Sequence, residues 1–269
     1  MPTVEELYAE LWAEDEAFRA ELDRSLDPRP AESLYDAFGA LGAGPGDDVL
    51  DVGCRYGAHS VEIVRRFGCR VIAVDPIPRH LEEARKLIAE EGVEDRVTVL
   101  EAAIESLPVE DGSVAYVWCR DMLNHVQLPV ALSECFRVLR PGGRMLVYQT
   151  FAADLCEPDE AHRLWSAVAI VPENMSRSYF EQTAHEAGFE ITAVDEIDSE
   201  WREFWLETGD RRTVDDLLRV ARLRRRETEL VARYGRESYE AALADSVWGA
   251  YQLLGKLCPT VYVLEKPHG

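Results

Sequence analysis

A glycine-rich turn flanked by two acidic residues is the part of the chain best suited to bind a ligand. Asp51 lies inside an apolar run, and Gly53 and Gly57 follow it closely. Glycines at such a turn let the backbone approach a ligand, because they have no side chain to block it. A second apolar run ends in Asp75. An acid at the end of the next strand can accept hydrogen bonds from ribose hydroxyls, so the pattern predicts a site for a nucleotide-like ligand.

Strands and helices alternate through the region that contains these residues. Apolar runs predict strands, and apolar residues three or four positions apart predict helices. The predicted strands are 49–52, 70–74, 97–100, 114–118 and 144–148, and helices are predicted at 58–67, from Pro78 onward and at 127–139. This alternation indicates an α/β fold with a doubly wound, mostly parallel, Rossmann-like sheet. Such sheets bind ligands at the carboxyl ends of their strands, where the glycine turn and Asp75 both fall.

The second half of the chain is mainly helical. A helix at 176–187 and a strand at 189–197 precede a long helical stretch and a final strand at 260–264, which brings the predicted sheet to seven strands. An insertion this long is usually functional or a subdomain of its own. We therefore expect three parts: an N-terminal helical lid (1–44, with helices at 3–24 and 31–41), a Rossmann-like core (45–198 plus 260–269) and a helical cap (199–259).

Composition limits the possible partners. The 269 residues are 47% hydrophobic and carry 29 basic against 51 acidic side chains, a formal net charge of −22. This balance argues against a nucleic-acid partner, which requires clustered positive charge. No apolar run approaches membrane-spanning length, and the acid-rich N-terminus does not resemble a signal peptide. Six cysteines without a Cys-x-x-Cys pair indicate reduced thiols, so we expect a cytoplasmic protein, with homodimerisation left open.

Several short motifs in a fixed order carry a resemblance to a known family. Together they resemble the class I S-adenosylmethionine-dependent methyltransferases, and within them the ubiquinone/sterol-type small-molecule methyltransferases. The resemblance covers residues 30–198 and the final strand. The motifs are Val49–Gly57, Val71–Asp75, Leu107-Pro108, Leu123–Val126 and Arg137–Gly143.

The resemblance implies S-adenosylmethionine as the cofactor and gives roles by position. It places the methionine part of the cofactor against Asp51, Gly53 and Gly57, and the ribose hydroxyls on Asp75. The adenine would lie between Ile104 and Glu105. Arg120 and Asp121, just past the fourth strand, would border the sulfonium and the substrate.

The chain departs from the family pattern at two positions. Arg55 replaces the middle glycine of the usual Gly-x-Gly-x-Gly turn, and Ala103 stands where many relatives have an aspartate that binds the adenine amino group. Arg55 can either form a charge-assisted hydrogen bond with the cofactor carboxylate or point away. Glu105 can replace the missing acid at the adenine.

Methyl transfer from a sulfonium is a direct displacement, so positioning can supply much of the rate acceleration. His125 is the candidate base if the acceptor must lose a proton, although it can equally pack at a helix start. Asp154 can orient His125 or act as the base, or be a solvated loop acid. Tyr148, Trp201 and Trp205 are candidate substrate contacts, with core packing or a dimer interface as the alternative. The histidines have no metal-ligand spacing, so no metal is expected.

The sequence thus predicts methyl transfer to a small, aromatic or polycyclic acceptor. It leaves open the identity of the acceptor and the choice between O-, N- and C-methylation. One alternative is a cofactor-binding protein of the same fold that catalyses a non-methylating reaction or acts as a binding module. A dinucleotide-dependent oxidoreductase fits less well, because the glycine spacing differs from Gly-x-Gly-x-x-Gly.

Overall fold

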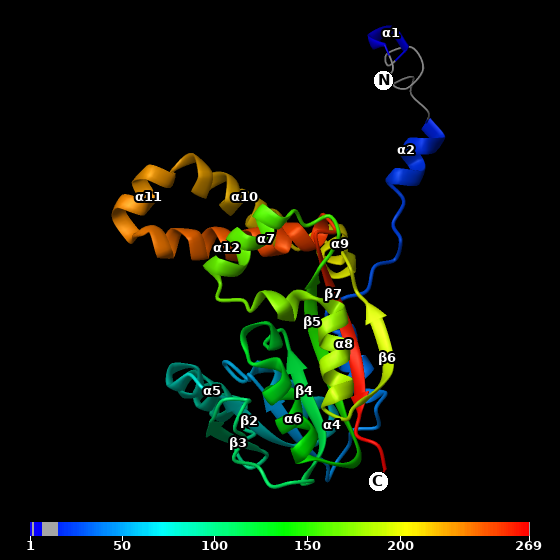
Figure 1. Ribbon diagram of the computed structural model, residues 1–269, viewed down its shortest axis with the longest axis vertical. Coiled ribbons are helices and arrows are strands. Elements are labelled where there is room, and N and C mark those ends of the chain that lie inside the picture. Colours follow the sequence, from blue (N-terminus) through cyan, green and yellow to red (C-terminus); the bar gives the residue numbers. More distant parts are fainter. Residues whose placement is uncertain (2, 7–15, 269) are drawn as a thin grey trace.

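The protein is built around a single seven-stranded sheet (Figure 1). The computed structural model describes residues 1, 3–6 and 16–268. The strand order is β3-β2-β1-β4-β5-β7-β6, and β7 runs antiparallel to its neighbours β5 and β6. The strands are β1 (Asp48–Val52), β2 (Arg70–Asp75), β3 (Val97–Glu101), β4 (Val114–Arg120), β5 (Leu139–Ala152), β6 (Glu190–Glu196) and β7 (Leu257–Glu265). The predicted doubly wound, mostly parallel α/β sheet is confirmed.

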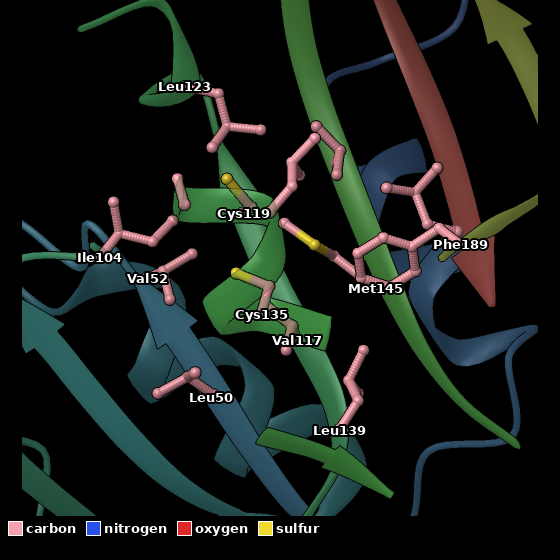
Figure 2. Close-up of a cluster of buried hydrophobic side chains, with 14 of the residues drawn as sticks. Leu50, Val52, Ile104, Val117, Cys119, Leu123, Cys135, Leu139, Met145 and Phe189 are labelled. Carbon is pink, nitrogen blue, oxygen red and sulfur yellow. The ribbon is translucent and has the colours of Figure 1, made fainter. Parts of the chain in front are cut away.

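Helices cover both faces of the sheet. The helices of the core are α3 (Ser33–Gly39), α4 (Ala58–Phe67), α5 (Pro78–Glu90), α6 (Leu128–Val138) and α8 (Arg177–Glu186). Successive residues of a strand point to opposite faces, and the buried strands are apolar on both. Val49 therefore packs with α3, α4 and α5, whereas Leu50 packs with α6 and α8. Figure 2 shows the second cluster, in which Ile104 lies beside Val52.

Parallel pairing brings the carboxyl ends of β1, β2 and β4 to the same edge. Val52 pairs with Val74 on one side and with Cys119 on the other. The residues that follow each strand therefore emerge next to one another. These are Gly53 after β1, Asp75 at the end of β2 and Arg120 at the end of β4.

Four helices, α9 (Glu200–Glu207), α10 (Arg212–Arg225), α11 (Glu227–Tyr234) and α12 (Arg236–Leu253), form the cap. They lie beyond the carboxyl ends of β4 and β5 (Figure 1). A further helix, α7 (Pro158–Ala167), and the 3-10 helix η3 (Pro172–Met175) precede α8. Leu164 and Trp165 of α7 pack with Ala244 of α12. Helices from two segments of the chain, 158–175 and 200–253, therefore lie together, whereas the sequence predicted a cap at 199–259 and a lid at 1–44.

Two other segments differ from the prediction. Strand β5 is longer than 144–148, because Leu139 already pairs with Val114 and β7 accompanies β5 as far as Ala152. Of the helix expected at 3–24, the structure describes α1 (Val4–Glu6) and α2 (Glu16–Leu22), and residues 7–15 lie outside the described part. Figure 1 shows α2 away from the sheet, whereas α3 buries Leu34 and Phe38 against it.

Candidate active site at the carboxyl edge of the sheet

The glycine turn after β1 is tied to β2 by backbone hydrogen bonds. The amides of Gly53 and Cys54 both donate to the carbonyl of Val74, each at 2.9 Å. Arg55 follows with φ of 50°, in the left-handed region that glycine normally occupies. The residue that replaces the middle glycine thus keeps the glycine-like backbone. Its guanidinium lies 4.9 Å from the centre of the exposed Tyr56 ring.

Asp75 is the hydrogen-bond acceptor that holds this edge together. Its side chain accepts from the backbone amides of Arg55 at 3.0 Å and Ile77 at 2.9 Å. Nδ1 of His80 lies 3.0 Å from the same carboxylate. The carboxylate is therefore fixed beside the glycine turn, in the position from which an acid can bind ribose hydroxyls.

Asp51 lies below the turn, out of contact with water. It is 1% exposed and accepts a hydrogen bond of 2.5 Å from Oγ of Ser60. Burial raises the pKa of Asp51 to about 7; the nearby charge of Asp75 also raises it, and the Ser60 hydrogen bond opposes the rise. This carboxyl therefore changes charge close to neutral pH.

Gly57 is required by the contact between two helices. Its φ is +79°, and a Cβ built there would lie 3.2 Å from Cβ of Ala84 on α5. We expect Gly57→Ala to destabilise the fold by about 2–4 kcal/mol, from left-handed strain plus overpacking. Gly92→Ala is the control, because Gly92 has φ of +65° with nothing within 4 Å. Denaturant unfolding that gives equal losses for the two variants would contradict this explanation.

A cavity of about 260 Å³ opens between this edge and the cap. It is lined by Arg55, Asp121, Asn124, His125, Val168, Ile170, Ala244, Asp245 and Trp248. Its floor is the loop after β4, and its roof is α12 with the segment after α7. The size suits a small molecule rather than a macromolecule.

Asn124 lines this cavity, and its amide oxygen is buried without a partner among the described residues. The side chain is 1% exposed, and Nδ2 donates to the carbonyl of Thr150 at 3.2 Å and to Sδ of Met175 at 3.1 Å. Oδ1 has no hydrogen-bond partner within the described residues. Buried polar atoms are normally paired, so an unpaired amide oxygen in a residue that lines a cavity is unusual.

Asp121 and His125 add two more acceptors. Asp121 accepts from Oγ1 of Thr150 at 3.1 Å; it is open to the cavity, while the surrounding protein raises the pKa of its carboxyl. Nδ1 of His125 lies 3.1 Å from the carbonyl of Ala169. A carbonyl only accepts, so Nδ1 carries the proton and Nε2 of the neutral ring keeps a lone pair. His125 is thereby in the tautomer that a base requires.

A second, smaller cavity of about 100 Å³ lies beside the first and shares Asp121 and Trp248 with it. Arg120, Tyr148, Trp201 and Trp205 are among its lining residues. The rings of Tyr148 and Trp201 stack with centres 4.7 Å apart and an interplanar angle of 3°. The predicted substrate contacts on β5 and α9 thus meet around Arg120.

The structure does not bring all the predicted site residues together. Asp154 lines a different cavity, with Cys156 and Pro172, and the hydrogen-bond partner of His125 is a backbone carbonyl instead. Ile104 is 3% exposed within the core cluster. Glu105 lies next to it and accepts from the amide of Gln127 at 3.2 Å.

Sequence reasoning missed Asn124, Asp245 and Trp248. Asn124 is adjacent to His125 in a motif that was already singled out, but its burial was not visible in the sequence. Asp245 and Trp248 are three residues apart on α12, a spacing that puts them on one helix face. That spacing was a usable signal, although nothing local indicated which way the face points.

The residues at the edge fit S-adenosylmethionine. The turn offers backbone with two glycines, and Asp75 offers a carboxylate beside it at the end of β2. These are the groups that a ribose and an amino-acid chain require. Within the described ranges, no cluster of three or more His, Cys, Asp or Glu side chains could hold a metal ion. No helix in that part of the chain is long and apolar enough to cross a membrane.

Comparison with known proteins agrees with this geometry. Residues 49–143 match the family model described as a methyltransferase domain. The chain is 30% identical to a sarcosine/dimethylglycine N-methyltransferase of Halorhodospira halochloris, over 69% of this chain and 64% of that protein, which is just under two thirds of its length. It is 28% identical to a dimethylglycine N-methyltransferase of Parasynechococcus marenigrum, over 98% and 88% of the two chains. Among solved structures, the [4+2]-cyclase SpnF superposes with a TM-score of 0.69 at 21% identity, covering 89% of this chain and 82% of that one.

Fold and site together define a Rossmann-like sheet that carries a glycine turn and an acid on the next strand at its carboxyl edge. Residues 49–143 match a methyltransferase domain, and the chain as a whole is similar to the class I S-adenosylmethionine-dependent methyltransferases. Its cofactor is S-adenosylmethionine.

Proposed function

We propose that the protein methylates a nitrogen atom of a small amine held in the cavity of about 260 Å³. The acidic side chains in the wall of this cavity are the observation that carries this proposal. The carboxylates of Asp121 and Asp245 line the same space. This set of acceptors suits an N–H donor and, after transfer, an ammonium product. Two of the relatives named above are N-methyltransferases, which supports nitrogen as the acceptor atom.

In this proposal the methyl group moves by direct displacement, after the amine has lost one proton. S-adenosylmethionine supplies the methyl group when bound: a nitrogen–carbon bond forms, and the sulfur–carbon bond breaks. A protonated amine has no lone pair for this attack, so Nε2 of His125 takes its proton first. Asp121 and Asn124 hold the amine, and the carboxylates offset the positive charge that moves onto nitrogen.

The cofactor contacts of the proposal are those of the carboxyl edge. Asp51, Gly53 and Gly57 would border the amino-acid part, and Asp75 the ribose. Ile104 and Glu105 would lie at the adenine. Asp154 receives no role, because it lines a separate cavity.

An aromatic or polycyclic acceptor remains a second candidate. The stacked pair of Tyr148 and Trp201, together with Trp205, gives the smaller cavity an aromatic wall that suits a planar ring. The non-methylating alternative also remains, since the SpnF structure named above belongs to a cyclase. Product analysis distinguishes all three, because they differ in added mass and in the atom that is modified.

The test is methyl transfer from isotope-labelled S-adenosylmethionine to a panel of small amines, including sarcosine and dimethylglycine, with phenols and sterols alongside. We expect N-methylated product, and a loss of about 10- to 100-fold in kcat/KM for Asp121→Asn, since hydrogen bonds to charged groups contribute about 1.5–3 kcal/mol. Asp154→Asn is the matched control, with the same change of charge outside the cavity. Product methylated only on oxygen or carbon, or equal losses in both variants, would rule the proposal out.

A further inference from the structure

Arg120, at the end of β4, forms no ion pair at contact distance with any carboxylate of the described residues, although the neighbouring Asp121 feels its charge. Its guanidinium lies 5.6 Å from the ring centres of both Tyr148 and Trp201. Nη1 lies 2.8 Å from Nε2 of His59, in the first turn of α4. Within the described residues, no acid lies within ion-pair distance of Arg120, although Asp121 and Asp198 line the same cavity.

The histidine that holds Arg120 does not neutralise it. Burial, together with the charge of Arg120, lowers the pKa of His59 to about 3, so the ring is neutral at physiological pH. Arginine only donates, so Nε2 accepts and the proton of the ring lies on Nδ1. Nδ1 in turn lies 2.6 Å from the hydroxyl of Tyr35, which stacks on Trp118 with ring centres 5.1 Å apart. His59 therefore accepts one hydrogen bond from Arg120 without a negative charge, and the remaining N–H donors of the guanidinium stay available.

The other buried arginine of the same cavity behaves differently. Arg202 donates to Oδ2 of Asp216 at 3.3 Å and to Oε1 of Gln252 at 2.9 Å, so its charge is paired and two of its donors are already used. A guanidinium held by two aromatic faces and a neutral imidazole is instead preorganised for an external anion, and its planar fork matches a carboxylate.

We propose that Arg120 is the receptor for a carboxylate, and that His59 and Tyr35 are the positioning residues that hold it. Two molecules at this site can supply the group: the amino-acid end of the cofactor, or an acceptor that is itself an amino acid. The possibility that the acceptor supplies the carboxylate rests on the proposed function. The cavity of about 100 Å³ has room for a group of this size.

The test is a binding comparison by calorimetry with two matched pairs of probes. S-adenosylhomocysteine is compared with 5′-methylthioadenosine, which lacks the amino-acid end. On protein saturated with S-adenosylhomocysteine, dimethylglycine is compared with N,N-dimethylethanolamine, which lacks the carboxylate. For Arg120→Gln we expect a selective loss in one of the two pairs. In that pair the probe with the carboxylate should bind about 10- to 100-fold more weakly, and the affinity of the probe without it should change by less than about 3-fold. The affected pair identifies the source of the carboxylate.

Variants of the positioning residues separate this role from a structural one. His59→Phe removes the acceptor, so it should weaken the same probe selectively, by about 3- to 10-fold. His59→Gln offers an amide oxygen to Arg120 and should restore binding, and Tyr35→Phe should have a smaller effect than His59→Phe. If Arg120→Gln does not fold, Arg120→Lys retains the charge without the fork and should show the same selectivity at about 10-fold.

Equal losses for both members of each pair, or no loss in either, would overturn the proposal. These measurements do not depend on turnover. A wild-type protein that binds the probes but methylates no amine would refute the proposed function alone, whereas unchanged selectivity in the variants would refute this inference alone.

Discussion

Asp75→Ala is expected to weaken the binding of S-adenosylhomocysteine by about 100-fold or more, as measured by calorimetry. Two ribose hydroxyls on one carboxylate contribute at least about 1.5 kcal/mol each, and every 1.4 kcal/mol is a factor of ten. The substitution also releases the amides of Arg55 and Ile77. The loss therefore combines a missing ligand contact with a loosened glycine turn.

Two other variants separate these contributions. Asp75→Asn keeps an oxygen for the backbone amides but has no charge, so we expect an intermediate loss. His80→Phe removes one contact to Asp75 and leaves the carboxylate in place, so binding should change by less than about 3-fold, as for a single neutral hydrogen bond. Unchanged affinity in Asp75→Ala would show that the cofactor does not use the end of β2.

The second large effect is a pH-dependent stability that originates at Asp51. Its pKa of about 7 in the folded protein lies above the ordinary value of 3.8, so the folded state binds this proton more tightly than the unfolded state. The stabilisation is complete below pH 3.8 and is lost as pH rises through about 7. At about 1.4 kcal/mol per pH unit, the total loss amounts to about 4 kcal/mol.

The measurement is the free energy of unfolding by denaturant at several values of pH from about 4 to 8. Asparagine does not titrate, so relative to Asp51→Asn the wild-type protein should lose stability from about pH 4 to about pH 7 and then level off. Asp95→Asn, at a side chain that is 81% exposed, is the control for removing one negative charge. A difference between wild type and Asp51→Asn that stays constant with pH would contradict the raised pKa.

The sequence was sufficient to predict the core, because apolar runs and helical periodicity both depend on residues close together in the chain. The apolar runs and helical periodicities placed the strands and helices of the sheet close to where the structure has them. Parallel pairing then forces the ends of β1, β2 and β4 together, so the approach of Asp75 to the glycine turn followed from the predicted topology. The left-handed backbone at Arg55 follows from the same motif, in which glycine usually occupies that position.

Tertiary packing decided the acceptor side of the site. Asn124 becomes an unpaired acceptor only because Thr150 and Met175 hold its amide nitrogen. Trp248 reaches the cavity only because α12 packs on α7. Asp154 was a candidate base in the sequence, with a solvated loop acid as the alternative, and in the structure it lines another cavity.

Arg120 shows the same division within a single residue. Its place at the end of β4 could be predicted from the sequence, because a strand and its end are set by nearby residues. Its lack of an acidic partner could not, since that depends on His59, Tyr148 and Trp201, which three other elements bring to it. Local periodicity fixes which residues reach the edge of the sheet, whereas the packing of distant helices fixes which charges are left unpaired there.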